Sequence, residues 1–252
     1  MNTLFFKTIY SSLALCLVFA QIARAEGAGA APETIVDLEP RTVFIPNGFD
    51  DNDDVVAVVD GYLPDTCHQL RSAFVEVNEA ARKIVIQPRM VDFTSSSVAC
   101  MDVTIPYTSV VHLGVLSPGQ YQITKRNGTA IQNLDVKRAG NQGPDDFLYA
   151  SVDGLQVTAN GGKAEVRLYG RHTNTCLTIE DVKVIPSLEG KTIALLPVMG
   201  RKPGTTARTV CETKEVPYEK VVKLPELVQN ERYLLHVRSS NGQSVNQVFT
   251  QY

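Results

Sequence analysis

A run of oxygen-bearing side chains, Asp50-Asp51-Asn52-Asp53-Asp54, is the densest set of potential metal ligands in the 252-residue chain. Carboxylate and carboxamide oxygens at this density suit calcium. Asp50, Asn52 and Asp54 have the spacing that opens an EF-hand loop, but valine stands where that loop needs glycine, and no glutamate closes it. An EF-hand is therefore excluded. Two interpretations remain: a looser calcium site at Asp50, Asn52 and Asp54, or an acidic loop that keeps a strand edge soluble.

Candidate binding residues lie in two corresponding stretches, Met90–Val98 and Gly200–Arg208, whose sequences differ strongly. The first stretch offers an apolar contact through Phe93. The second offers positive charge for an acidic ligand or partner through Arg201, Lys202 and Arg208. Loops on a rigid scaffold often carry binding function, so we expect these loops to contact a partner. Unconstrained variation of a surface is the alternative explanation.

No combination of nucleophile, base or metal ligand in the sequence supports catalysis. The four histidines, His68, His112, His172 and His236, form neither an HxH nor an HExxH pair. The chain contains no G-x-S-x-G segment around a nucleophilic serine. The sequence therefore predicts a protein that is not an enzyme and that needs no cofactor, calcium apart. A hydrolase whose site is assembled from distant residues is the enzymatic alternative.

The N-terminal residues have the pattern of a secretory signal. Lys7 is followed by the apolar run Ile9–Ile22 and by Ala23-Arg24-Ala25, the small-residue pattern that precedes cleavage. We expect residues 1–25 to be removed and the mature chain to be periplasmic or secreted. No later stretch approaches the length of a membrane span. The mature chain would carry 22 basic and 27 acidic residues, a formal charge of −5, which argues against nucleic acid as a partner.

Four cysteines follow the leader, namely Cys67, Cys100, Cys176 and Cys211. An even number in an exported chain favours disulfides. A structural zinc site is the alternative, but its usual closely spaced C-x-x-C pairs are absent.

The second half of the chain repeats the first. Setting Cys67 on Cys176 places Gly61 on Gly170 and Pro88 on Pro197 without a gap. After a short insertion Cys100 falls on Cys211 and Tyr107 on Tyr218, and after another Tyr121 falls on Tyr233. An Asn-Gly pair follows each of the tyrosines Tyr121 and Tyr233, at Asn127-Gly128 and Asn241-Gly242. Because the halves are copies, we expect one disulfide within each, Cys67 with Cys100 and Cys176 with Cys211.

The hydrophobic pattern between these landmarks predicts strands. Apolar residues alternate with polar ones through Ala73, Val75 and Val77 and again through Ile84 and Ile86, a period of two. We expect strands at 41–45 and 55–59, a hairpin inside each disulfide loop, and a two-residue hairpin turn at each Asn-Gly. Many short strands without an amphipathic helix indicate a β-sandwich.

The stretch Leu116-Ser-Pro-Gly119-Gln-Tyr121 resembles the tyrosine corner of immunoglobulin and fibronectin type III sandwiches, in which the tyrosine hydroxyl bonds to upstream backbone. Two features depart from those folds. The chain has no tryptophan, and each cysteine pair brackets a hairpin. We therefore predict an all-β chain of two tandem immunoglobulin-like (Greek-key) modules, at 34–138 and 147–252, joined by a linker at 139–146.

This organisation suggests an exported, non-enzymatic binding, interaction or structural protein. Its sandwich loops would contact a protein or a component of the cell envelope. The alternative is a carbohydrate-binding or small-ligand-binding protein, with or without calcium at Asp50, Asn52 and Asp54.

Overall fold

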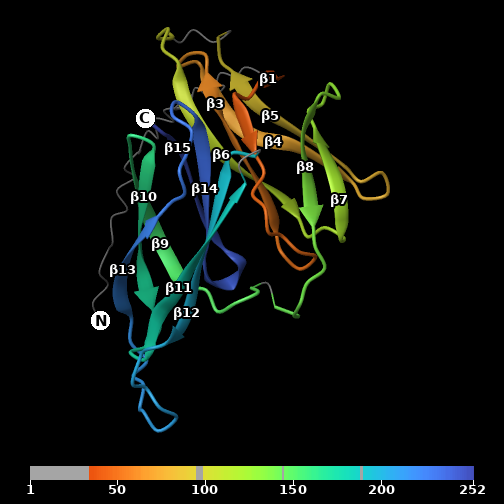
Figure 1. The fold of residues 1–252 in the computed structure, drawn as a ribbon. Helices are drawn as coiled ribbons and strands as arrows, with labels where there is room; N and C mark the ends of the chain where they lie inside the picture. The colour runs from red at the N-terminus through yellow and green to blue at the C-terminus, as the bar shows by residue number, and fades with distance from the viewer. Residues whose placement is uncertain (1–33, 95–98, 144, 188–189) are drawn as a thin grey trace, which may run out of the picture. The chain divides into compact units, whose positions relative to one another are not determined.

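The computed structural model describes residues 34–94, 99–143, 145–187 and 190–252, and residues 33–252 form one compact unit. Regular structure in these ranges consists of β-strands and one short 3-10 turn, η1 (Ser240–Gly242). The fold is all-β and sandwich-like, as predicted (Figure 1). None of the described residues belongs to a helix that is long and apolar enough to span a bilayer. The predicted signal peptide, residues 1–25, lies outside the described ranges.

The first half of the compact unit contains two sheets around one core. Its strands are β1 (Thr34–Asp37), β2 (Thr42–Phe44), β3 (Val55–Leu63), β4 (His68–Asn78), β5 (Lys83–Asp92), β6 (Ile105–Gly114), β7 (Gly119–Thr124) and β8 (Ala130–Val136). One sheet has the order β2-β3-β6, and the other has the order β1-β5-β7-β8 with β4 on β5. Val55 from the first sheet and Ile84 and Tyr121 from the second lie in the same buried cluster.

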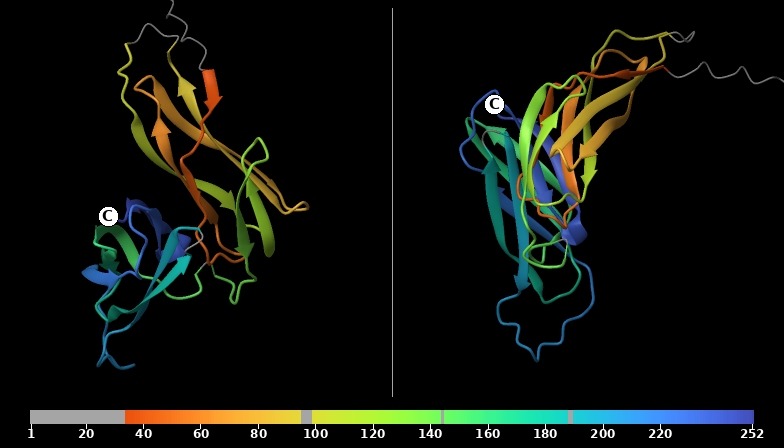
Figure 2. Two further views of the ribbon diagram at one scale, coloured as in Figure 1. Left: turned by 45° about the horizontal axis from the view of Figure 1, so that its top comes forward. Right: turned by 90° about the vertical axis from the view of Figure 1, so that its right-hand side faces the viewer.

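The second half has the corresponding elements. Its strands are β9 (Ser151–Asn160), β10 (Lys163–His172), β11 (Leu177–Ser187), β12 (Thr192–Arg201), β13 (Val216–Lys223), β14 (Arg232–Arg238) and β15 (Ser244–Thr250). The sheets β13-β10-β9 and β11-β12-β14-β15 enclose a second cluster that includes Val166, Ile193 and Tyr233. Figure 2 shows these strands from two further sides.

Burial follows the hydrophobic pattern of each strand. In β10, Ala164, Val166 and Leu168 are buried while the lysine, glutamate and arginine between them are exposed, as period-two alternation requires. In contrast, β3 is buried along nearly its whole length because its sequence, Val55-Val-Ala-Val-Val59, is apolar at every position. A continuous apolar run of this kind is typical of a strand that is covered on both faces.

The two halves share backbone details at equivalent positions. In each, a hairpin joins the two strands that the disulfide loop encloses, β4–β5 and β11–β12, as predicted. A left-handed residue follows each turn, Arg82 with φ 50° and Lys191 with φ 49°. The carbonyl oxygens of these two residues accept the backbone N–H of Gln122 and Leu234, respectively, both at 2.9 Å. The N–H donors begin the parallel pairings of β5 with β7 and β12 with β14, which the sequence did not suggest.

Both predicted two-residue turns differ from the structure. Asn127-Gly128 and Asn241-Gly242 both connect antiparallel strands, but neither is a two-residue turn. Between β7 and β8 only the glycine has positive φ, 87°, and the N–H of Lys125 donates to the Thr129 carbonyl oxygen. The loop is longer than predicted because the Asn127 carboxamide accepts the Thr129 N–H, at 3.0 Å, and so stabilises a wider turn.

The predicted tyrosine corner is present in the first half. The hydroxyl of Tyr121, a residue that is 1 % exposed, donates to the Ser117 carbonyl oxygen at 2.9 Å. In the second half the hydroxyl of Tyr233 instead accepts the backbone N–H of Val228 at 3.1 Å. Each tyrosine therefore ties the start of its strand to the preceding loop.

A third apolar cluster joins strands from opposite halves of the sequence. Phe44 and Val58 pack with Leu234, and all three are fully buried. Nearby, the Arg232 guanidinium donates to the Asp60 carboxylate at 2.6 Å. These contacts cover Val58 of β3 and Leu234 of β14, which do not belong to the core cluster of either half. The division into modules at 34–138 and 147–252 stays a prediction.

Candidate functional site

The acidic run lies between β2 and β3, and one of its carboxylates is buried against β14. Asp53 accepts two hydrogen bonds from Arg238, at 2.7 Å to Oδ1 and 2.5 Å to Oδ2. The two residues are 3 % and 6 % exposed. The same guanidinium lies 5.2 Å from the Phe49 ring centroid. Asp53 is therefore committed to a buried ion pair that anchors the loop.

The other residues of the calcium prediction contact different protein groups. Asp50 accepts the Asn52 backbone N–H at 3.2 Å, and burial raises the pKa of Asp50. The Asn52 carboxamide donates to the Asn141 carbonyl oxygen at 3.0 Å. Asp54 Oδ2 lies 2.6 Å from His112 Nδ1.

In the described part of the chain, three side chains away from the acidic run bring atoms that can bind a metal close together. They are those of Asp65, Cys67 and Cys100. The two sulfurs are joined in a disulfide, which leaves a single carboxylate. The calcium site at Asp50, Asn52 and Asp54 stays a prediction.

A hollow of about 570 Å³ opens beside the acidic run. Side chains from the acidic loop, β3, β6, β14 and the turn into β15 line it. They include Asn52, Asp54, Val110, His112, His236 and Gln243. The structure thus brings two of the three predicted calcium residues, Asn52 and Asp54, together with two of the four histidines. We call this feature the amide-lined hollow.

His236 lies in the wall of the amide-lined hollow and is 1 % exposed. Its Nδ1 lies 2.8 Å from Asn246 Oδ1. Because a carboxamide oxygen only accepts, Nδ1 carries the proton and Nε2 is left as an acceptor. In the described residues Nε2 is buried and has no hydrogen-bond partner. Burial lowers the pKa of His236 to about 4, so the ring is neutral at physiological pH.

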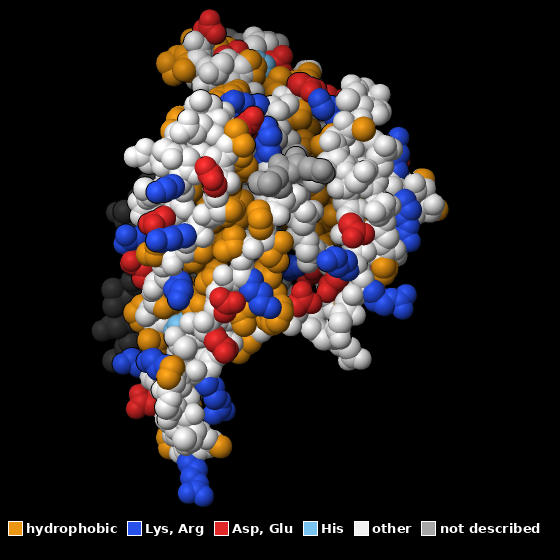
Figure 3. All heavy atoms as spheres, viewed as in Figure 1, with side chains coloured by type: hydrophobic (Ala, Val, Ile, Leu, Met, Phe, Trp, Pro, Cys, Tyr) orange, Lys and Arg blue, Asp and Glu red, His pale blue; other side chains and the backbone are white. Residues whose placement is uncertain are grey.

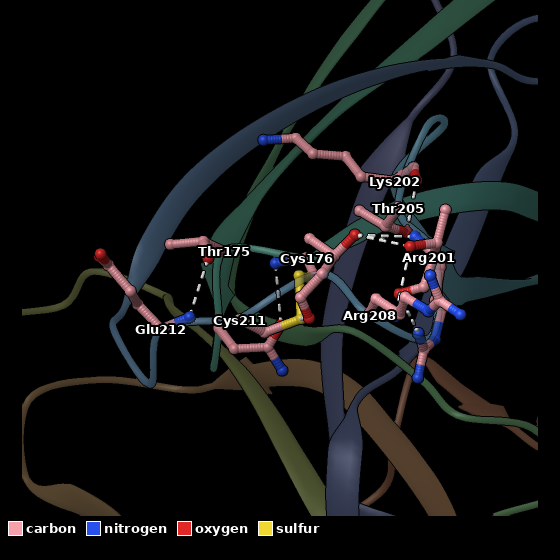
Figure 4. The surroundings of a disulfide bond; sticks show 11 residues. Thr175, Cys176, Arg201, Lys202, Thr205, Arg208, Cys211 and Glu212 are labelled. Atoms are coloured by element: carbon pink, nitrogen blue, oxygen red, sulfur yellow. Dashed lines mark hydrogen bonds between the residues drawn. A yellow bond between two sulfur atoms is a disulfide. The ribbon is translucent and has the colours of Figure 1, made fainter.

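The two disulfides form as the repeat predicted, Cys67 with Cys100 and Cys176 with Cys211. Each is reinforced by the threonine before its first cysteine. Thr175 Oγ1 accepts the Glu212 N–H at 3.1 Å (Figure 4), and Thr66 Oγ1 accepts the Met101 N–H at 2.8 Å. The segments 93–104 and 202–215 are thereby held to the ends of their sheets. We call them the first and second disulfide tips; residues 95–98 of the first are not described.

The predicted binding residues lie at these tips. The backbone N–H groups of Phe93 and Lys202 donate to the carbonyl oxygens of Cys67 and Cys176, at 2.9 and 2.8 Å. Lys202 and Arg208 are exposed on the second tip, and Arg201 is exposed at the end of β12, directly before the tip. Arg201 Nη1 lies 3.5 Å from the Thr206 carbonyl oxygen of the tip. The second tip extends away from the strands (Figures 1 and 2), and Lys and Arg side chains stand at its end in the surface view (Figure 3).

Several exposed apolar residues on the tips were not among the predicted binding residues. Met101 is 67 % exposed, Val103 is 49 % exposed and Val210 is 88 % exposed. Their sequence positions could have indicated them, since each lies within three residues of Cys100 or Cys211 and outside any strand. Large apolar side chains that a sheet does not cover are candidates for partner contact.

Comparisons with known proteins identify one similarity. A family model described as the ORF11 beta-sandwich domain matches residues 57–136, the range from β3 to the end of β8. This match agrees with the sandwich-like fold of the first half. No curated protein and no solved structure matches the chain.

Proposed function

We propose that this chain is an exported, non-enzymatic binding protein built of two tandem immunoglobulin-like modules, and that its disulfide tips contact a protein or a component of the cell envelope. The repeated details support the tandem arrangement: matching disulfides, matching left-handed residues and matching tyrosines at the loop before a strand. The leader-like residues 1–25 and the paired cysteines support export.

The observation that carries the proposal is the exposure of apolar side chains beside both disulfides. Val210, next to Cys211, is 88 % exposed, and Met101, next to Cys100, is 67 % exposed. A disulfide restrains the backbone next to each of these residues, so the backbone that presents them is partly preorganised. Binding to preorganised groups loses less entropy than binding to flexible ones.

Charge suggests the chemistry of the partner surface. The stretch from Gly200 to Val210 contains Arg201, Lys202 and Arg208 and no acidic residue. In the part of the tip before Cys211, the apolar side chain of Val210 is therefore accompanied only by positive charges. A partner that combines an apolar patch with carboxylates or phosphates would be complementary to this surface.

Affinity capture tests the proposal. The oxidised protein is immobilised and exposed to envelope extract and culture medium of the source organism, beside the variants Val210→Ser and Met101→Ser. Val228→Ser is the matched control, because Val228 is 65 % exposed but lies outside both tips. We expect a partner that the wild type and the control retain and that at least one tip variant loses.

Capture of the same partners by all four proteins would contradict a role for the tips. Loss of capture by Val228→Ser alone would place the contact elsewhere. Melting temperatures measured in parallel verify that the variants are folded.

A further inference from the structure

The amide-lined hollow has the chemistry of a ligand site that is separate from the disulfide tips. Carboxamide side chains are concentrated in its wall, with Asn52 from the acidic loop, Asn241 and Gln243 from the turn before β15, and Asn246 from β15 itself. A carboxamide presents both donors and acceptors of hydrogen bonds. Such a wall is suited to a ligand that is itself rich in groups that both donate and accept.

The charges of the hollow are paired within the protein. Asp54 contacts His112 at 2.6 Å, and Arg238 is bound by Asp53. In the described lining, each carboxylate and guanidinium thus has a polar partner within the protein, and the contact of Asp54 is an ion pair when His112 is protonated. An ionic ligand would compete with these contacts, whereas a neutral ligand would not.

Buried acceptors provide an independent indication of a missing donor. His236 Nε2 and Asn52 Oδ1 are both buried and, among the described residues, without a hydrogen-bond partner. Buried acceptors are rarely left unsatisfied in folded proteins. A ligand hydroxyl or a bridging water would supply the donor that each atom lacks, after a local shift of the wall that opens access to these buried atoms.

Part of the lining is apolar. Val56, Val110 and Val115 belong to it, and Val110 and Val115 are 41 % and 60 % exposed. A ligand that fits both kinds of lining has C–H groups as well as hydroxyls. Sugars have this combination.

We infer that the amide-lined hollow binds a neutral saccharide, with the sugar C–H face on the valines and the hydroxyls on the carboxamides. Gln243 and Asn241 on the turn after β14 contact the hydroxyls, and Val110 on β6 supports the ring. This site is separate from the proposed partner contact, because none of its lining residues belongs to a disulfide tip.

The test uses the oxidised full chain and a panel of uncharged mono- and disaccharides, comprising glucose, galactose, mannose, N-acetylglucosamine and their α- and β-linked dimers. Amide chemical shifts of the protein are followed during titration. We expect at least one sugar to bind with a Kd of about 1 mM or tighter and to shift the amides of Asn241, Gln243 and Asn246.

Two variants and one control locate the binding. We expect Gln243→Ala to weaken it about tenfold, as the loss of one hydrogen bond does, and Val110→Ser to weaken it without a large change in melting temperature. Gln229→Ala is the matched control, because Gln229 is exposed and outside the hollow. Failure of every uncharged sugar to bind would overturn the inference, as would binding of acidic sugars alone or binding that Gln243→Ala and Val110→Ser leave unchanged.

Discussion

Arg238 and Asp53 form a two-point ion pair that is almost completely buried and joins residues 185 positions apart in the chain. The pair links the last residue of β14 to the loop before β3 and lies behind the wall of the amide-lined hollow. Neither charge can be solvated if its partner is removed. The pair is therefore the most sensitive polar contact between the two halves.

Removal of the buried guanidinium should destabilise the protein strongly. Arg238→Ala leaves the Asp53 carboxylate buried without a cation, and we expect the free energy of unfolding to fall by about 3–5 kcal/mol. Arg167→Ala is the matched control. It breaks an ion pair with Glu219 in which both side chains are more than half exposed, and the expected loss is under about 1 kcal/mol. Denaturant titration measures the loss of stability in both variants. Equal losses would contradict a stabilising buried ion pair between Arg238 and Asp53.

His236 should make the stability depend on pH. Its pKa is 6.5 in the unfolded chain and about 4 in the folded one, mainly because burial disfavours the imidazolium. The unfolded chain therefore binds the extra proton, so the stabilisation is complete above about pH 6.5 and is lost as the pH falls towards 4. As the pH falls from 6.5 to 4, we expect protonation of His236 in the unfolded chain to lower the free energy of unfolding by roughly 3 kcal/mol.

The comparison that isolates His236 is its replacement by asparagine, which keeps a donor near Asn246. His236→Asn should show a flatter loss of stability between pH 7 and pH 4.5, roughly the window set by the two pKa values. Asp50 contributes with the opposite sign because burial raises its pKa, and this contribution is common to both proteins. His112→Asn, at an exposed ring, is the control. An unchanged pH profile in His236→Asn would contradict the prediction.

The disulfides should contribute equally. They close loops with sequence separations of 33 and 35 residues, for which the chain-entropy model gives about 4 kcal/mol each. We expect the double variants Cys67→Ala/Cys100→Ala and Cys176→Ala/Cys211→Ala to lose similar stability in thermal or chemical unfolding. A large difference would indicate that one half is not a separate cooperative unit.

Two equivalent glycines should differ in their tolerance of a methyl group. A Cβ on Gly61 would lie 2.8 Å from the Tyr107 hydroxyl, the end of a side chain that can move, whereas one on Gly170 would lie 2.0 Å from the Ser151 carbonyl oxygen of the backbone. We expect Gly61→Ala to cost about 1–3 kcal/mol and Gly170→Ala to cost more. Gly140→Ala meets no atom within 4 Å and should be nearly neutral. The order of the three melting temperatures checks this.

Features that depend on local sequence were predictable. The cysteine pairing followed from the alignment of the halves, and the tyrosine corner at Tyr121 followed from its surrounding residues. The expected strands at 41–45 and 55–59 correspond to β2 and β3, although β3 continues to Leu63. In these places the nearest neighbours in sequence determine the backbone.

Features that depend on contacts between the halves were not predictable. The alignment shows which positions are equivalent, but it does not show which outer faces meet. The ion pair between Arg238 and Asp53 therefore had no sequence signal. The apolar run Val55–Val59 of β3 did carry a signal, because a strand segment without polar positions needs cover on both sides.

The packing of Val58 against Leu234 uses surfaces that are not equivalent in the two halves. In the register of the repeat, Val58 corresponds to Arg167 and Leu234 corresponds to Gln122, both exposed. The contact thus joins unlike faces, and a head-to-tail contact of this kind can in principle be extended indefinitely. The positions equivalent to Val58 and Leu234 carry a guanidinium at Arg167 and a carboxamide at Gln122. Repeating the contact at these positions would bury polar groups without partners, which is costly, so the apolar contact is confined to one face of each half.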